Sequence, residues 1–224
     1  TDSLREFVAI ENTNNVPIAF GSIANQNLHA MPQQDMLIVT RNAMLPQAQE
    51  LAQFHRDKQG LNVAVVELNQ IYNEFSSGTN DISAIRDFVK MFYDRAAGDS
   101  ALMPKYLLLF GDGTYNNKSL HDYLLPCYQS QASFESLQTY VSDDYFGLMD
   151  DNEGANINNT AAEIMDVAVG RIPADDFTKA QTAVEKIKRY YVNAAYGDWR
   201  NQGTFVADDE DRNIHIADAN DIAD

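Results

Sequence analysis

Short apolar runs alternate with amphipathic helical segments along this chain, and that alternation limits the fold more than any other feature. The first run is MLIVT at 36–40 and the second is LNVAVVEL at 61–68. Between them, residues 46–58 have helical periodicity that puts Leu51 on an apolar face. Two buried strands joined by one helix are typical of a parallel pair with a crossover connection. We therefore predict a βαβ unit over this part of the chain.

The same order recurs further along the sequence. The other predicted elements are a helix over 81–95, a strand over 106–110, a strand over 164–173, a helix over 178–193 and a strand over 203–207. Strands that alternate with helices in this way indicate an α/β protein. The predicted fold class is α/β, with a parallel sheet flanked by helices.

Three stretches are expected along the chain. Residues 1–34 fit no βαβ unit and are predicted to be a tail or linker strand from an upstream domain, with REFVAI resembling a strand. Residues 35–163 form the first lobe, including a long polar loop insertion that begins at residue 111; loops of that length are usually functional. Residues 164–224 end the first lobe and open a second, truncated one, because the last helical pattern has no Gly, Pro or basic closing turn.

The charge balance excludes some partners. Sixteen Lys and Arg stand against thirty-three Asp and Glu, which gives a net charge of −17 at pH 7. A chain this acidic repels nucleic acid phosphates and anionic lipid, so neither nucleic acid nor a membrane surface is an expected partner. No apolar run is long enough for a transmembrane segment. Cys127 is the only cysteine, which excludes an internal disulfide and a cysteine zinc cluster.

Polar loops follow the predicted strands. Ligands of open α/β sheets bind beyond the carboxyl ends of the strands, where Gly111-Asp112-Gly113 and Asp208-Asp209-Glu210 are expected. The stretch GDGTYNN lacks the spacing of GxGxxG and of GxxxxGK[ST], and no helix start follows it. The sequence therefore disfavours a nucleotide site.

Carboxylates in the insertion suggest a metal site. Asp112, Asp143 and Asp144 each follow apolar residues that would hold them in place, and carboxylate oxygens are the ligands that calcium prefers. The alternative is that Asp112 only hydrogen-bonds its own loop and that the acids of DDNEG, at 150–154, form a solvated turn. Both interpretations are open from the residues alone.

Cys127 and Arg171 each have a functional and a structural interpretation. Cys127 follows a proline, has no Lys or Arg beside it in sequence, and is more typical of a small buried hydrophobe than of a nucleophile. Arg171 is either a substrate clamp or a partner of a nearby acid. His215 is the histidine closest to the expected ligand edge.

Five long segments together resemble the gingipain-type cysteine peptidases, and among them the sortases of type IX secretion. They are YNEFSSGTNDISAIRDFVKMFYDRA, PKYLLLFGDGTYNNK, YVSDDYFGLMDDNEG, VAVGRIPADDFTKAQTAVEKIKRYY and GDWRNQGTFVADDEDRNIH. The resemblance runs from about Gln26 to the last residue. It implies that the α/β units are the first lobe of a gingipain/caspase-like catalytic domain.

The resemblance also implies roles for individual residues. The family's catalytic His, in a His-Gly motif, and its nucleophilic Cys belong to later strands, and Cys127 does not match that nucleophile. Glu210 corresponds to a carboxylate close to the catalytic His, with Asp209 as the second choice. Asn213 and His215 correspond to the substrate-binding connection. Calcium binding in this part of the family's catalytic domain favours Asp112, Asp143 and Asp144 as ligands.

The function implied is that of a cell-surface cysteine endopeptidase, or sortase, on the extracellular side of the outer membrane. Its expected substrates are secreted proteins that carry a C-terminal sorting domain, and its expected partners are other type IX secretion components. The chain is expected to be inert by itself, because the catalytic dyad is absent from it. The alternative is a non-catalytic, peptidase-like module for docking, or a structural module stabilised by calcium.

Overall fold

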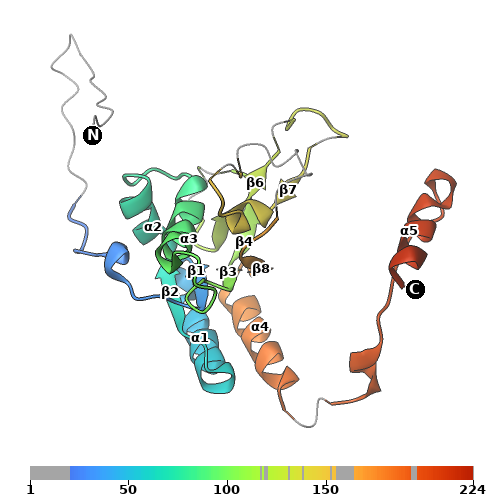
Figure 1. Ribbon diagram of the computed structural model, residues 1–224, viewed down its shortest axis with the longest axis horizontal. Helices are drawn as coiled ribbons and strands as arrows, with labels where there is room; N and C mark the ends of the chain where they lie inside the picture. The colour runs from blue at the N-terminus through green and yellow to red at the C-terminus, as the bar shows by residue number, and fades with distance from the viewer. Residues whose placement is uncertain are drawn as a thin grey trace.

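A four-stranded parallel sheet lies at the centre of the computed structural model (Figure 1). The structure describes residues 21–116, 118, 121–130, 132–137, 139–151, 153–154, 164–192 and 196–223, so the predicted strand REFVAI lies outside the described residues. The strand order is β2-β1-β3-β8, and every neighbouring pair is parallel. These strands are Val63–Glu67, Met36–Thr40, Tyr106–Phe110 and Ala168–Ile172. The predicted fold class is confirmed.

Two helices cover each face of the sheet. On one face, α1 (Leu45–Gln59) and α4 (Phe177–Tyr190) enclose a core that includes Ile38, Leu51 and Phe110. On the other, α2 (Leu68–Phe75) and α3 (Ser83–Ala96) enclose a core built around Leu37, Leu109, Phe88 and Phe92. Because alternate side chains of a strand point to opposite faces, each strand contributes to both cores.

Local signals set the helix ends. Helix α1 ends at Gly60, whose φ of 68° is the left-handed conformation that glycine adopts without strain. The Asp81 carboxylate accepts a hydrogen bond from the Ser83 N–H at the start of α3, over a distance of 2.9 Å. The Asp176 side chain accepts from the Lys179 N–H at the start of α4, at 2.8 Å. These caps confirm the predicted helices to within a few residues.

Helix α2 was not predicted, because residues 61–68 read as one strand. The strand ends at Glu67, whose carboxylate accepts a hydrogen bond from the Asn69 N–H at 2.8 Å. The Gln70 side chain accepts one from the Glu67 N–H in return, at 3.3 Å. This capping box starts the helix one residue after the strand, which a pattern of apolar residues does not reveal.

The insertion after β3 is part of the lobe. It contains the parallel pair β4 (Asp112–Thr114) and β5 (Leu124–Pro126), the antiparallel pair β6 (Tyr128–Gln129) and β7 (Val141–Ser142), and the 3-10 helix η3 (Asp144–Gly147). Tyr145 and Phe146 of η3 are buried in the core under α3. The insertion therefore shares the hydrophobic core of the lobe.

The end of the predicted N-terminal tail packs on the lobe. The 3-10 helix η1 (Leu28–Ala30) is held by Glu74 of α2, whose carboxylate accepts hydrogen bonds from the Leu28 N–H at 2.7 Å and from the Gln26 amide at 2.8 Å. Gln33 donates to the carbonyls of Phe92 and Leu102. From Gln26 onwards this segment is thus in contact with the lobe.

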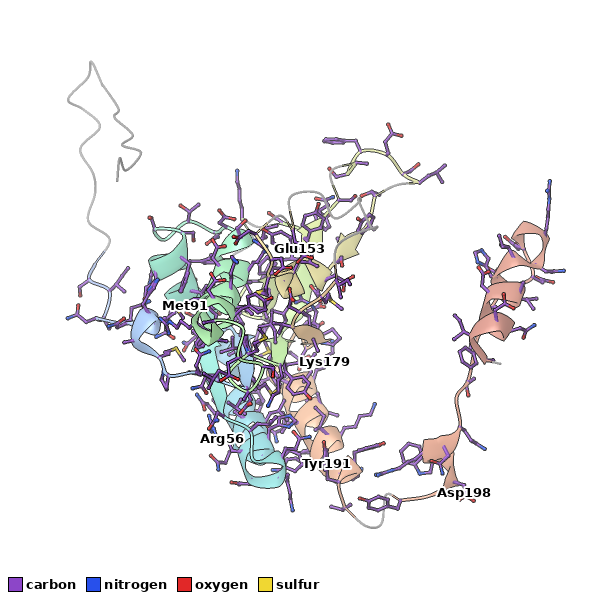
Figure 2. All side chains as sticks on the ribbon, in the orientation of Figure 1. Arg56, Met91, Glu153, Lys179, Tyr191 and Asp198 are labelled. Atoms are coloured by element: carbon purple, nitrogen blue, oxygen red, sulfur yellow. The ribbon has the colours of Figure 1, made fainter. Side chains whose placement is uncertain are left out.

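The predicted strand at 203–207 is wrong. These residues, all of them described, form no strand, and Phe205 and Val206 are 51% and 91% exposed. Next to them are η5 (Asp198–Asn201), η6 (Asp211–Asn213) and α5 (Ile214–Ala223), which lie apart from the sheet in Figure 1. In Figure 2 the side chains from Asp198 onwards stand away from those that pack around the sheet.

Topology disfavours one place that this segment could take, the edge of the sheet beside β8. The connection from β1 through α1 leads toward the β2 edge, and α4 covers the same face as α1. A strand added beside β8 through α4 would lie toward the opposite edge, so its crossover would have the opposite hand. Left-handed crossovers are rare in parallel sheets.

None of the helices in the described part of the chain is long and apolar enough to cross a membrane.

Candidate functional site

The loops after β3 and β8 meet at the carboxyl edge of the sheet, as predicted. The Gly111 N–H donates to the Ile172 carbonyl at 3.0 Å, and the Asp112 N–H lies within hydrogen-bonding distance of the Tyr123 and Ala174 carbonyls. A Cβ on Gly111 would come within 2.8 Å of the Tyr123 carbonyl oxygen. Glycine is therefore required here by the close approach of another backbone segment, and the loop is a tightly packed turn.

Arg171 of β8 connects the segments at this edge. Its Nε and Nη2 donate to the two carboxylate oxygens of Asp143, each at 2.7 Å. Its Nη1 donates to the carbonyls of Gly111 and Asp112, at 3.2 and 3.3 Å, and Nη2 also donates to the Pro126 carbonyl at 3.0 Å. A guanidinium has five N–H groups, and the five acceptors here match that number. The pairing of Arg171 with an acid is confirmed, and no donor remains for a substrate clamp.

The three carboxylates predicted to bind calcium are not gathered into one site. Asp143 pairs with Arg171, the Asp112 carboxylate accepts the Gly113 N–H at 2.8 Å, and Asp144 is exposed. Among the described residues, no group of three or more His, Cys, Asp or Glu is placed to hold a metal ion. The predicted ligand set therefore does not fit the structure, because an internal guanidinium already neutralises its best placed member.

We call Arg171 and the five oxygen atoms that accept its hydrogen bonds the Arg171 brace. Cys127 lies beside this brace and is half-buried. A Cβ on Gly113 would come within 2.7 Å of its Sγ, so the glycine makes room for the thiol. Burial raises the pKa of Cys127; Arg171 opposes that shift, and Asp143 adds to it. A thiol with a raised pKa is mostly protonated at neutral pH and is a poor nucleophile. The structure agrees with the interpretation of Cys127 as a packed side chain.

Glu210, Asn213 and His215 lie in the C-terminal segment, away from the carboxyl edge of the sheet (Figure 1). Glu210 is exposed, and its carbonyl accepts the Asn213 N–H at 3.0 Å. Asn213 has a φ of 63°, and Arg212 before it has a φ of 62°. His215, at the start of α5, lines a recess together with Phe205 and Asp208. The expected position at the end of a fifth sheet strand is wrong, and the catalytic and substrate-binding roles stay predictions.

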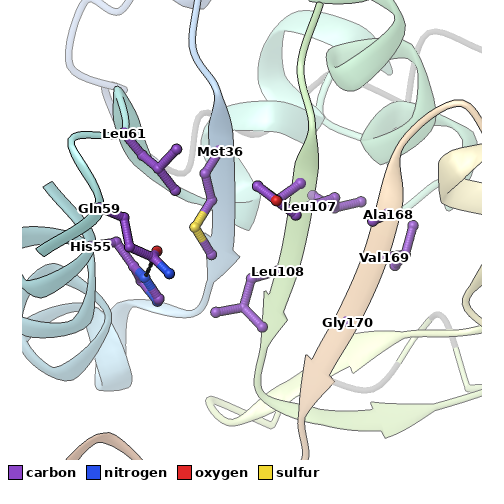
Figure 3. Close-up of a pocket in the computed structure, with 10 residues that line it drawn as sticks. Met36, His55, Gln59, Leu61, Leu107, Leu108, Ala168, Val169 and Gly170 are labelled. Carbon is purple, nitrogen blue, oxygen red and sulfur yellow. Dashed lines mark hydrogen bonds between the residues drawn. The ribbon is translucent and has the colours of Figure 1, made fainter. Parts of the chain in front are cut away.

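A hollow lies at the amino end of the sheet, opposite the carboxyl edge where Arg171 lies (Figure 3). It has a volume of about 490 Å³, and its walls come from α1, β1, β3 and β8. His55 and Gln59 of α1 are hydrogen-bonded to each other at its rim, at 2.6 Å between Nδ1 and Oε1. Its other walls are mainly apolar, including Met36, Leu61 and Leu108. No motif predicted this hollow, because its walls come from a helix and three strands that only the fold brings together.

Comparisons with known proteins agree with this architecture. The sequence profile of Peptidase family C25 matches residues 29–224. The crystal structure of dimeric latent PorU from Porphyromonas gingivalis is similar to this chain, with a TM-score of 0.69 and 37% sequence identity. The match covers 86% of this chain and 19% of the PorU chain, so this chain spans about a fifth of that length. No curated protein matches the sequence. By its sequence over residues 29–224 and by its fold, the chain belongs to peptidase family C25.

Proposed function

We propose that this chain is the first lobe, with the opening of the second, of the catalytic domain of a cysteine endopeptidase. In this proposal the intact protein removes C-terminal sorting domains from secreted proteins and helps to attach those proteins to the cell surface. The observation that carries it is the 37% identity with PorU over 86% of this chain, within a family of cysteine peptidases. Family membership implies protein substrates.

The proposed reaction of the intact protein is acyl transfer through a thioester. A thiolate attacks the scissile carbonyl, the amine leaves with a proton donated by a histidine, and water or a second amine then releases the acyl group. Glu210 is proposed to orient that histidine. Asn213 and His215 are proposed to lie along the bound peptide. The sheet-centred lobe serves as the rigid support beside this centre.

The role of Glu210 is tested in the intact protein. Glu210→Gln should lower the rate of substrate processing at least tenfold while leaving the unfolding midpoint unchanged, because an amide orients a histidinium less well than a carboxylate. Asp209→Asn is the matched control one residue away, and its effect should be small. The opposite order of effects would assign the role to Asp209, and unchanged rates for both variants would reject the proposal.

The chain by itself is proposed to be inert. Its single cysteine has a raised pKa and is packed against Gly113, which supports the absence of a reactive thiolate. A thiol-reactive peptide analogue should label Cys127 no faster than free cysteine, and peptide cleavage should be undetectable. Cleavage that Cys127→Ala abolishes would contradict this.

We propose the extracellular side of the outer membrane as the location and other type IX secretion components as partners. A non-catalytic docking module is the second candidate, favoured by the exposed Phe205, Val206 and Ile222 in the C-terminal segment. Loss of partner binding in Val206→Ser, together with no detectable substrate processing by the intact wild-type protein, would favour docking over catalysis.

A further inference from the structure

Five oxygen atoms, from four residues in three segments of the chain, surround the guanidinium of Arg171. Two belong to the Asp143 carboxylate, and three are the carbonyl oxygens of Gly111, Asp112 and Pro126. The Arg171 side chain is 12% exposed and that of Asp143 is 25% exposed, so water contributes little to the solvation of either charge. These oxygens converge on a single, largely buried positive charge.

Carboxylate and backbone carbonyl oxygens are also the ligands with which proteins hold calcium. Without a cation in this place, a carboxylate and three carbonyl dipoles would face one another in a partly buried site, and the surrounding chain has a net charge of −17. We propose that Arg171 is the built-in cation of this carboxyl edge, which holds the loops after β3, β5 and β7 together in place of a metal ion. This inference does not depend on the proposed peptidase activity.

The shape of the guanidinium suits this role. Its planar fork bonds both oxygens of Asp143, and its remaining N–H groups reach carbonyls of two other segments. A lysine ammonium has only three donors at one point and cannot form the same set. The site thus selects arginine by donor number as well as by charge.

The brace has a consequence for metal dependence. Asp143 is one of the predicted calcium ligands, and its charge is already paired with that of Arg171. Calcium bound only to the native state would raise the unfolding midpoint. If Arg171 supplies the cation, the midpoint should be the same with millimolar calcium chloride and with excess chelator.

Thermal unfolding of the 224-residue chain tests this in two arms. In the first, Arg171→Met should lower the midpoint by about 10 °C, because it leaves a partly buried carboxylate unpaired. Lys179→Met is the control: it breaks the exposed pair between Lys179 and Asp175 at the start of α4, whose side chains are 59% and 47% exposed, and should cost about 2 °C or less. An Arg171→Met midpoint no lower than that of the control would overturn the proposal.

In the second arm, the wild type and Asp143→Asn are compared with and without calcium. Equal midpoints for the wild type in both solutions support the built-in cation. A calcium-dependent rise of several degrees that Asp143→Asn abolishes would overturn it, because the carboxylate would then be a metal ligand. If Arg171→Met does not fold, Arg171→Lys replaces it; this variant keeps the charge but loses the fork, and a midpoint equal to the wild type would also reject the proposal.

Discussion

The segment from β8 through α4 and the segment from residue 203 through α5 are both an apolar run followed by a helix, but only the first is packed. Helix α4 buries Ala180 and Val184 against the sheet and α1. Helix α5 has no buried residue among those described, and Val206 ahead of it is 91% exposed. The difference is that only the first segment has a partner in the sheet. β8 pairs with β3, whereas a strand at 203–207 placed beside β8 would need a left-handed crossover through α4, which is rare.

The largest contrast between the two regions should come from deleting a phenylalanine. Phe88→Ala removes a fully buried ring of α3 and should lower the free energy of unfolding by about 3 to 5 kcal/mol. Phe205→Ala, the matched change in the C-terminal segment, should cost less than about 0.5 kcal/mol. Denaturant unfolding measures both, and similar losses would show that the C-terminal segment is packed after all.

The free energy of unfolding should depend on acid pH through residues 26–33, which pack on the lobe. The segment from residue 203 through α5 should contribute no such dependence. Burial alone would raise the pKa of Glu74, but hydrogen bonds from Leu28, Gln26 and His29 outweigh it and lower the pKa to about 2. The carboxylate therefore stabilises the fold above its unfolded pKa of about 4.5, and this contribution is lost as the pH falls from about 4.5 to 2. Glu74→Gln should cost about 2 to 3 kcal/mol at pH 7 and nothing near pH 2.

Asp221→Asn on the exposed helix α5 is the control for Glu74, measured by denaturant unfolding over the same pH range. It should leave the stability profile unchanged. A Glu74→Gln profile parallel to the wild type down to pH 2 would show that the contacts with Gln26, Leu28 and His29 do not hold in solution.

Replacing one glycine in the lobe and one in the C-terminal segment should show how closely the backbone of each region is packed. Gly147 ends η3, and a Cβ there would lie 2.5 Å from the Val167 carbonyl oxygen and 2.9 Å from a methyl group of Val169. Gly147→Ala should therefore cost about 2 kcal/mol, because neither neighbour is free to move. Gly203→Ala meets only the far end of the Phe205 ring, at 3.7 Å, and should be neutral within about 0.5 kcal/mol. Calorimetric midpoints that fall equally would remove the contrast.

The smallest effect is expected where α4 meets α1. The Tyr191 hydroxyl accepts a hydrogen bond from the Gln59 amide at 2.9 Å, in an exposed position. Tyr191→Phe should cost about 0.5 kcal/mol. Tyr196→Phe, in the segment after α4, is the control and should have no measurable effect. A loss above about 2 kcal/mol for Tyr191→Phe would mean that α4 depends on this contact more than on Ala180 and Val184.

Much of the lobe could be predicted from sequence, because its signals are local. The runs at 36–40 and 106–110 became β1 and β3 without change, and α1 (Leu45–Gln59) extends the predicted helix by one residue at each end. Helix α2 was missed because its start depends on a capping box inside an apolar run. The site was predicted less well: Gly111-Asp112-Gly113 lies at the carboxyl edge as expected, but Asp208-Asp209-Glu210 does not, and the predicted calcium ligands did not come together.

The sequence by itself determined the α/β class, the approximate positions of the four sheet strands and the family, but it also predicted a strand at 203–207 that does not form. Only the tertiary structure decided which groups meet. Arg171 and Asp143 are 28 residues apart, and sequence spacing does not show that they form a pair. Likewise, only the structure shows that residues 203–207 pair with no strand of the sheet. The backbone N–H and C=O groups of a strand need hydrogen-bond partners on a neighbouring strand. Packing across the whole fold determines which strand that neighbour is.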